Sequence, residues 1–133
     1  MNVLTVRPLW AWAIFNAGCD IINRKFPTSH GGKLAIHASK TLLPDDQIAF
    51  IAIRKRLGNS FEIPKDSELV LGAIIGMVDL AGCVRSSNSK WFTGDYGFVF
   101  RNPIPLAKPI VCRGQLGFWS VPDESIFRRI KTA

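Results

Sequence analysis

Residues 69–84 form a nearly continuous apolar run that is broken by Gly72, Gly76 and Gly82. The run is too rich in glycine and β-branched residues for a stable helix. It predicts a long central strand that bends at its glycines, as the closure of a small barrel requires. We therefore expect a mixed or antiparallel sheet in which residues 69–80 form the longest strand.

The sequence before this run alternates β-like and helical stretches. A β-like stretch, Val3–Val6, precedes a helical one that begins at Pro8 and ends at Gly18. Proline suits the first turn of a helix, where its missing N–H needs no partner, and glycine suits the C-terminal cap. A second β-like stretch ends at Arg24, and Lys33–Ala38 is expected to be a further strand.

The clearest helical signal lies at residues 44–57. Pro44 and two acidic residues occupy the first turn, three basic residues occupy the last turn, and a glycine follows directly. This order of charges complements the helix dipole. Ile48, Ile51 and Ala52 fall on one face and give the helix an apolar side.

The rest of the chain completes one compact unit. Residues 98–101 and 115–121 are expected to be strands, and residues 122–131 a short helix. The 133 residues contain no repeat or linker and are enough for one core but not for two. We predict a single α+β domain over residues 1–133.

The order of these stretches matches a known family pattern: a short strand, Gln-Pro-Trp-Ala, a helix that ends in Gly-Lys, and Glu-x-Arg. The matching stretch here runs from Leu4 to Thr28. Four later stretches, 32–40, 71–80, 96–103 and 112–119, look like the later blocks of that family in the same order. The chain therefore resembles the ASCH family of the PUA-like superfamily over nearly its whole length.

The resemblance implies a small PUA-like β-barrel with two or three flanking helices. In the family pattern, the arginine at the position of Arg24 points into a cleft between the barrel and its helices, and the resemblance implies the same for Arg24. Related bacterial proteins include an amidohydrolase that removes the acetyl group from N4-acetylcytidine. In that enzyme a lysine near the end of the first helix acts with a threonine and a glutamate. Cys19 and Ile22 stand at the first two of these places, so this chain departs from the pattern where the family is most reactive.

The charge points to a polyanionic partner. The formal net charge is +7, and residues 1–58 carry eight Lys or Arg against three Asp or Glu. A basic small domain attracts nucleic acid first. We expect a partner of this class, with single-stranded RNA favoured.

Four residues are candidates for the cleft. Arg24 closes an apolar strand and needs a carboxylate, an anion or a planar ligand as its partner. Lys40 is placed to contact phosphate, with Ser39 beside it as a hydrogen-bond donor. Trp10 is placed to stack on a base, although core packing is the alternative. If the PUA-like arrangement holds, Arg24, Trp10 and Lys40 approach one pocket.

A second candidate edge is the loop that leads to Trp91 and Tyr96. It carries Arg85 and Lys90 among small polar residues. Aromatic and basic residues together suit single-stranded nucleic acid, and a plain connection between strands is the alternative reading.

Catalysis has two weak candidates. Cys19 can act as a nucleophile only with a lowered pKa, and His37 would have to serve as its base. Two hypotheses therefore stay open: a non-catalytic nucleic-acid-binding module, or a hydrolase of RNA or of a modified nucleoside, similar to the N4-acetylcytidine amidohydrolase or a ribonuclease.

The sequence indicates no metal, cofactor or membrane partner. Cys19, Cys83 and Cys112 lie far apart without a C-x-x-C pair, which argues against a zinc site or a disulfide framework. No apolar run approaches the roughly 20 residues of a membrane span. A cytoplasmic location is expected.

Overall fold

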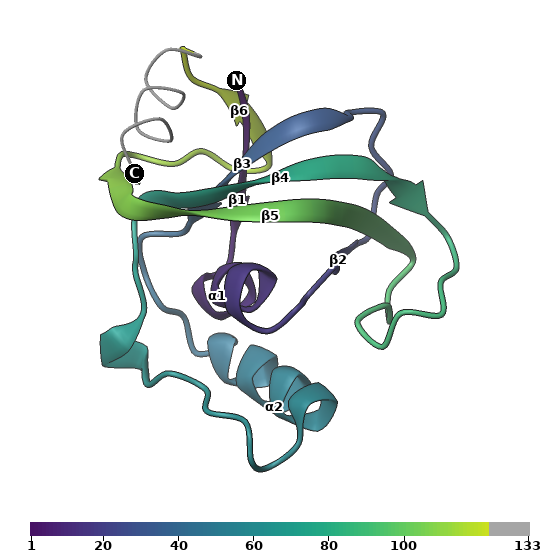
Figure 1. Ribbon diagram of the computed structural model, residues 1–133, viewed down its shortest axis with the longest axis vertical. Coiled ribbons are helices and arrows are strands. Elements are labelled where there is room, and N and C mark those ends of the chain that lie inside the picture. The colour runs from purple at the N-terminus through teal and green to yellow at the C-terminus, as the bar shows by residue number, and fades with distance from the viewer. Residues whose placement is uncertain (123–133) are drawn as a thin grey trace.

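A computed structural model describes residues 1–122, and Figure 1 shows how their elements are arranged. The elements in chain order are β1 (Asn2–Val6), α1 (Pro8–Asn16), β2 (Ile21–Arg24), β3 (Gly32–Ala38), α2 (Asp46–Leu57), a 3-10 turn (Asp66–Glu68), β4 (Ala73–Val84), β5 (Tyr96–Val111) and β6 (Phe118–Ser120).

The strands form one curled sheet in the order β2-β5-β4-β3-β1-β6. β1 and β3 are parallel, and the other neighbours are antiparallel. α1 lies against the sheet, and α2 lies on the far side of α1 (Figure 1). The predicted α+β class and mixed sheet are confirmed, and the curled sheet is consistent with a small barrel-like fold.

The sheet buries side chains on both faces. Leu4, Ile36 and Val78 belong to the main core beneath α1, whereas their neighbours Val3, Ala35 and Met77 belong to a smaller core. Successive residues of a strand point to opposite faces, so each strand supplies both cores.

The longest strand is not where the sequence placed it. β5 has 16 residues, whereas β4 has 12 and begins only at Ala73. The sequence does not predict the full length of β5, because it contains Pro103, Pro105 and Pro109, and proline usually argues against a central strand. Beyond Phe100, however, β4 is the only described strand that pairs with β5, and this open edge tolerates proline.

The orientation of α2 also differs from the prediction. The helix buries Ala49 and Ile53, while Ile48 and Ile51 are 67% and 57% exposed. The helix carries its own apolar residues on several sides, so their periodicity alone did not identify the face that packs against the protein. The helix expected at residues 122–131 lies almost wholly outside the described residues.

Gly76 is a position where the fold requires glycine. A Cβ there would come within 2.5 Å of the Phe15 ring and 2.7 Å of the Ile104 carbonyl oxygen. The absence of a side chain lets α1 pack directly on β4, and this contact fixes how closely the helix lies on the sheet.

Gly76→Ala should therefore destabilise the protein by roughly 1–3 kcal/mol, the usual cost of overpacking a core. Gly82→Ala is the matched control in the same strand, because a Cβ there meets nothing within 4 Å. Chemical denaturation of both variants measures the difference. Equal unfolding free energies would contradict the close packing of Phe15.

Candidate nucleic-acid interface

A cavity of about 740 Å³ opens at one end of the sheet. At this end β1 and β3 finish at Val6 and Ala38, and β4 begins at Ala73. A volume of this size lies within the usual range for small-molecule sites. The lining residues come from four stretches of the chain: Thr5, His37, Ser39, Lys40, Leu71, Gly72, Val111, Cys112, Arg113, Gly114, Gln115 and Leu116.

His37 lines the cavity but is 1% exposed, and protein groups contact both of its ring nitrogens. Nε2 lies 2.9 Å from the Cys112 carbonyl oxygen, which can only accept a hydrogen bond, so Nε2 carries the proton. Nδ1 then accepts from the Thr5 hydroxyl over a longer 3.4 Å contact. The Trp119 indole donates to the same hydroxyl at 2.9 Å. In the neutral imidazole these contacts select the tautomer that carries its proton on Nε2.

Gly114 closes over the histidine ring. A Cβ at this position would lie 2.4 Å from His37 Cε1, so the backbone approaches the ring more closely than any other residue type allows. This approach directs the segment after Cys112 across the strand ends and forms one wall of the cavity.

The cavity carries positive charge. Lys40 and Arg113 line it, and its lining includes no Asp or Glu. Ser39 also lines it, and its buried hydroxyl has no hydrogen-bond partner among the described residues. A buried hydroxyl without a partner is costly, and an anionic ligand oxygen would satisfy it. The arrangement can hold an anion against otherwise mainly apolar walls.

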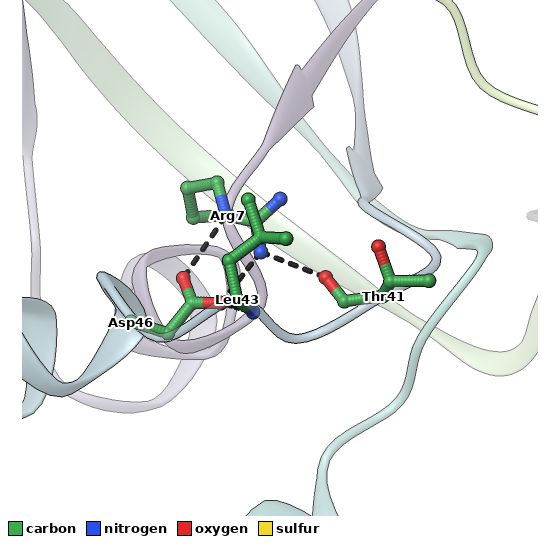
Figure 2. Close-up of polar contacts among 4 residues, drawn as sticks. All are labelled: Arg7, Thr41, Leu43 and Asp46. Atoms are coloured by element: carbon green, nitrogen blue, oxygen red, sulfur yellow. Dashed lines mark hydrogen bonds and ion pairs between the residues drawn. The ribbon is translucent and has the colours of Figure 1, made fainter.

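Arg7 fixes the segment that carries Ser39 and Lys40 (Figure 2). Its Nε donates to Asp46 Oδ1 at 3.0 Å, and one of its terminal nitrogens donates to Asp46 Oδ2 and to the Thr41 carbonyl at 2.7 Å. Asp46 also accepts the Leu43 N–H at 2.6 Å. These bonds join the start of α1 to the start of α2. They also hold the loop between β3 and α2, residues 39–45, in place.

Arg24 lies at the opposite end of the sheet from Lys40. It pairs in register with Tyr96, at the start of β5, and the Arg85 guanidinium lies 5.7 Å from the Tyr96 ring centre. The expected convergence of Arg24, Trp10 and Lys40 on one pocket is therefore wrong. The strand pairing places Arg24 and Lys40 at opposite ends of the sheet, and Trp10, on α1, does not line the cavity that contains Lys40. No described carboxylate pairs with Arg24, and burial lowers its pKa.

Trp10 and Trp91 pack edge to face beneath α2, with ring centres 6.2 Å apart. Trp91 is only 2% exposed and belongs to the main core, so it cannot offer a face to a base. Arg56 lies about 6 Å from both rings and donates to the Lys90 carbonyl. The Lys90 ammonium lies 5.8 Å from the Trp91 ring. We read this cluster as packing between α2 and the loop.

Cys19 is not poised for catalysis. It is 2% exposed, and its thiol donates to the Ile21 carbonyl. Burial raises its pKa to about 12, the opposite of what a nucleophile requires. His37 lines a different cavity from Cys19, and its nitrogens are engaged elsewhere. The Cys–His pair considered from the sequence is therefore not formed.

Sequence reasoning missed Arg113 and the network around His37. Arg113 lies in the block 112–119 that resembles the family pattern, just before the strand expected at 115–121, and neither feature singles it out as a site residue. Its approach to Lys40 depends on β5 running antiparallel to β4, and no local pattern reports such a pairing.

Two further properties concern only residues 1–122. No group of three or more His, Cys, Asp or Glu side chains there could hold a metal ion, and all three cysteines are free thiols. No helix in this part of the chain has the length and apolar character needed to span a membrane.

No protein-family model matches the sequence, and no curated protein is significantly similar to it. The resemblance to ASCH domains accordingly stays a prediction made from the motifs themselves.

We expect the Cys19 thiol to resist alkylation in the native state. With a pKa of about 12, roughly one thiol in 10⁵ is ionised at pH 7. Mass spectrometry after iodoacetamide treatment should find Cys19 unlabelled until denaturant is added, whereas the partly exposed Cys83 and Cys112 serve as internal comparisons. Rapid native labelling of Cys19 would reinstate it as a candidate nucleophile.

Asp46→Asn should destabilise the protein in a pH-dependent way. Hydrogen bonds from Arg7 hold the pKa of Asp46 below its ordinary value. The stability that this carboxylate contributes is therefore present above its unfolded pKa, about 3.9, and is lost as pH falls through the lowered folded pKa.

We expect a loss of roughly 1–3 kcal/mol at pH 7, as for other charged hydrogen bonds, that shrinks below about pH 4. Urea denaturation across this range measures it. Asp95→Asn removes an exposed carboxylate and serves as the control. If the loss of unfolding free energy in Asp46→Asn stays the same below pH 4, the charge of Asp46 is not its cause.

Proposed function

We propose that the protein binds single-stranded nucleic acid, with RNA favoured, through the cavity at the end of β1 and β3. The observation that carries this proposal is the grouping of Lys40, Arg113 and the unpartnered Ser39 hydroxyl around a cavity lined by no carboxylate. Two cations from different segments suit a phosphate backbone, because phosphate contacts supply most of non-specific affinity.

The walls of the cavity suit the rest of a nucleotide. Leu71, Val111 and Leu116 supply apolar surface, and the Gln115 amide can hydrogen-bond to a base edge or a ribose hydroxyl. The net charge of +7 adds long-range attraction for a polyanion.

The proposal includes a PUA-like, ASCH-related fold and a cytoplasmic location. We propose binding rather than hydrolysis, because Cys19 is a buried neutral thiol and both ring nitrogens of His37 contact protein groups. A hydrolytic alternative would need other residues as its nucleophile and base.

The double variant Lys40→Gln/Arg113→Gln tests the proposal. Removing two phosphate contacts should weaken binding of a labelled single-stranded RNA by about tenfold or more, and should reduce the slope of log K against log salt by roughly 0.7 per lost contact. Arg113→Lys keeps the charge but loses the planar fork, so it should bind more weakly than wild type at every salt concentration.

Lys65→Gln is the matched control, since Lys65 is exposed and lies outside the cavity lining. Fluorescence anisotropy with RNA and DNA, single- and double-stranded, gives the affinities, and thermal melting checks the fold. Wild-type affinity in the double variant would refute the cavity as the binding site and direct attention to Arg24, Arg85 and Tyr96 at the other end of the sheet.

A further inference from the structure

α2 presents a second apolar face that the described chain leaves largely exposed, although the Arg54 guanidinium lies 5.6 Å from the centre of the Phe50 ring. Its inner face buries Ala49 and Ile53, while Ile48, Phe50 and Ile51 are 67%, 42% and 57% exposed on the other side. The middle of the helix, residues 48–53, is apolar on every side, and such a stretch is ordinarily covered all round. Contiguous exposed apolar surface commonly marks an interaction site.

A groove beside this face extends the apolar surface. It has a volume of about 340 Å³ and includes Phe50 and Ile51 from α2 together with Leu9, Leu43 and Leu69 from neighbouring segments. Asp46 and Asp66 also line it, which disfavours a nucleic acid or an anionic membrane as the occupant.

The charges along α2 are complementary to those of a second α2 running the opposite way. Asp45 precedes the first turn, and Lys55 lies in the last turn. Spacings of three and four residues place Asp45, Ile48, Ile51 and Lys55 along one stripe of the helix. The stripe is therefore acidic at one end, apolar in the middle and basic at the other end.

We propose that a second copy of this chain docks on this face, with the two α2 helices packed antiparallel about a twofold axis that crosses the stripe of Ile48 and Ile51 at the level of residue 50. Asp45 and Lys55 lie equally far from Phe50 in sequence, so this axis brings Asp45 of each copy beside Lys55 of the other. Ile48 of each copy then packs near Ile51 of the other. A twofold interface must be self-complementary in this way.

The antiparallel arrangement also sets the N-terminus of each helix dipole beside the C-terminus of the other, which is favourable. No residue of α2 lines the cavity that contains Lys40 and Arg113, so dimerisation leaves that cavity open. The inference thus goes beyond the proposed function, and either can fail without the other.

Sedimentation equilibrium over a series of protein concentrations tests the dimer. Wild type should shift from monomer to dimer as concentration rises, and Ile48→Glu should remain monomeric. Phe26→Glu is the matched control, since Phe26 is 77% exposed and lies outside α2. A wild-type monomer at every concentration would overturn the proposal, as would an Ile48→Glu variant that dimerises like the control.

Charge exchange then tests the geometry. Asp45→Lys and Lys55→Asp should each weaken the dimer, because each variant places two pairs of like charges across the interface. An equimolar mixture of the two variants should dimerise again, since each cation then faces an anion of the other copy. Within one helix these positions are too far apart to pair, so the recovery reports contact between copies.

Circular dichroism and thermal melting confirm that each variant is folded. If the mixture stays monomeric while wild type dimerises, the antiparallel arrangement is wrong. Measuring RNA affinity for Ile48→Glu separates the two proposals: unchanged intrinsic affinity per copy is expected if the cavity binds independently of the dimer.

Discussion

The hydrogen-bonded chain through His37 is the constraint on which the end of the molecule that holds the cavity depends. It joins β1 through Thr5, β3 through His37 itself, the segment after β5 through Cys112, and β6 through Trp119. His37 is the only fully buried polar or charged side chain among residues 1–122. A buried polar group is tolerated only when its partners are in place, so these four segments must meet in one geometry. The cavity is the space that this geometry leaves at the strand ends.

The two proposed surfaces divide the molecule according to charge. The cavity end gathers Lys40 and Arg113 without carboxylates, whereas the outer face of α2 is apolar and carries acidic groups at one end. Arg7 links them, because its bonds to Asp46 and Thr41 hold the loop between Lys40 and the start of α2. A dimer built on α2 would offer two cavities to one strand. Binding at the second cavity then becomes intramolecular, which raises the effective affinity without any new type of contact.

Local signals predicted the first half of the fold well. Pro8 begins α1, and β2 ends at Arg24. The features that sequence reasoning missed depend on long-range pairing. Arg24 and Lys40 each close a strand, and only the antiparallel pairing of β2 with β5, β5 with β4 and β4 with β3 shows that they lie at opposite ends of the sheet. Arg113 entered the candidate site for the same reason, because its place follows from the far end of β5 rather than from its neighbours in sequence.

The prolines that make β5 hard to recognise in the sequence also protect the sheet from pairing with other chains. From Arg101 to Val111 this strand pairs with β4 on one side, with register shifts opposite Val78 and Ile75, and with no described strand on the other, which leaves a long edge of the sheet open. An open edge is a template for pairing with a foreign strand and hence for aggregation. Pro103, Pro105 and Pro109 lack the N–H groups that such pairing needs, and Lys108 adds charge between two of them. The same residues that make this segment unlike a strand in sequence thus keep the exposed edge from recruiting other chains.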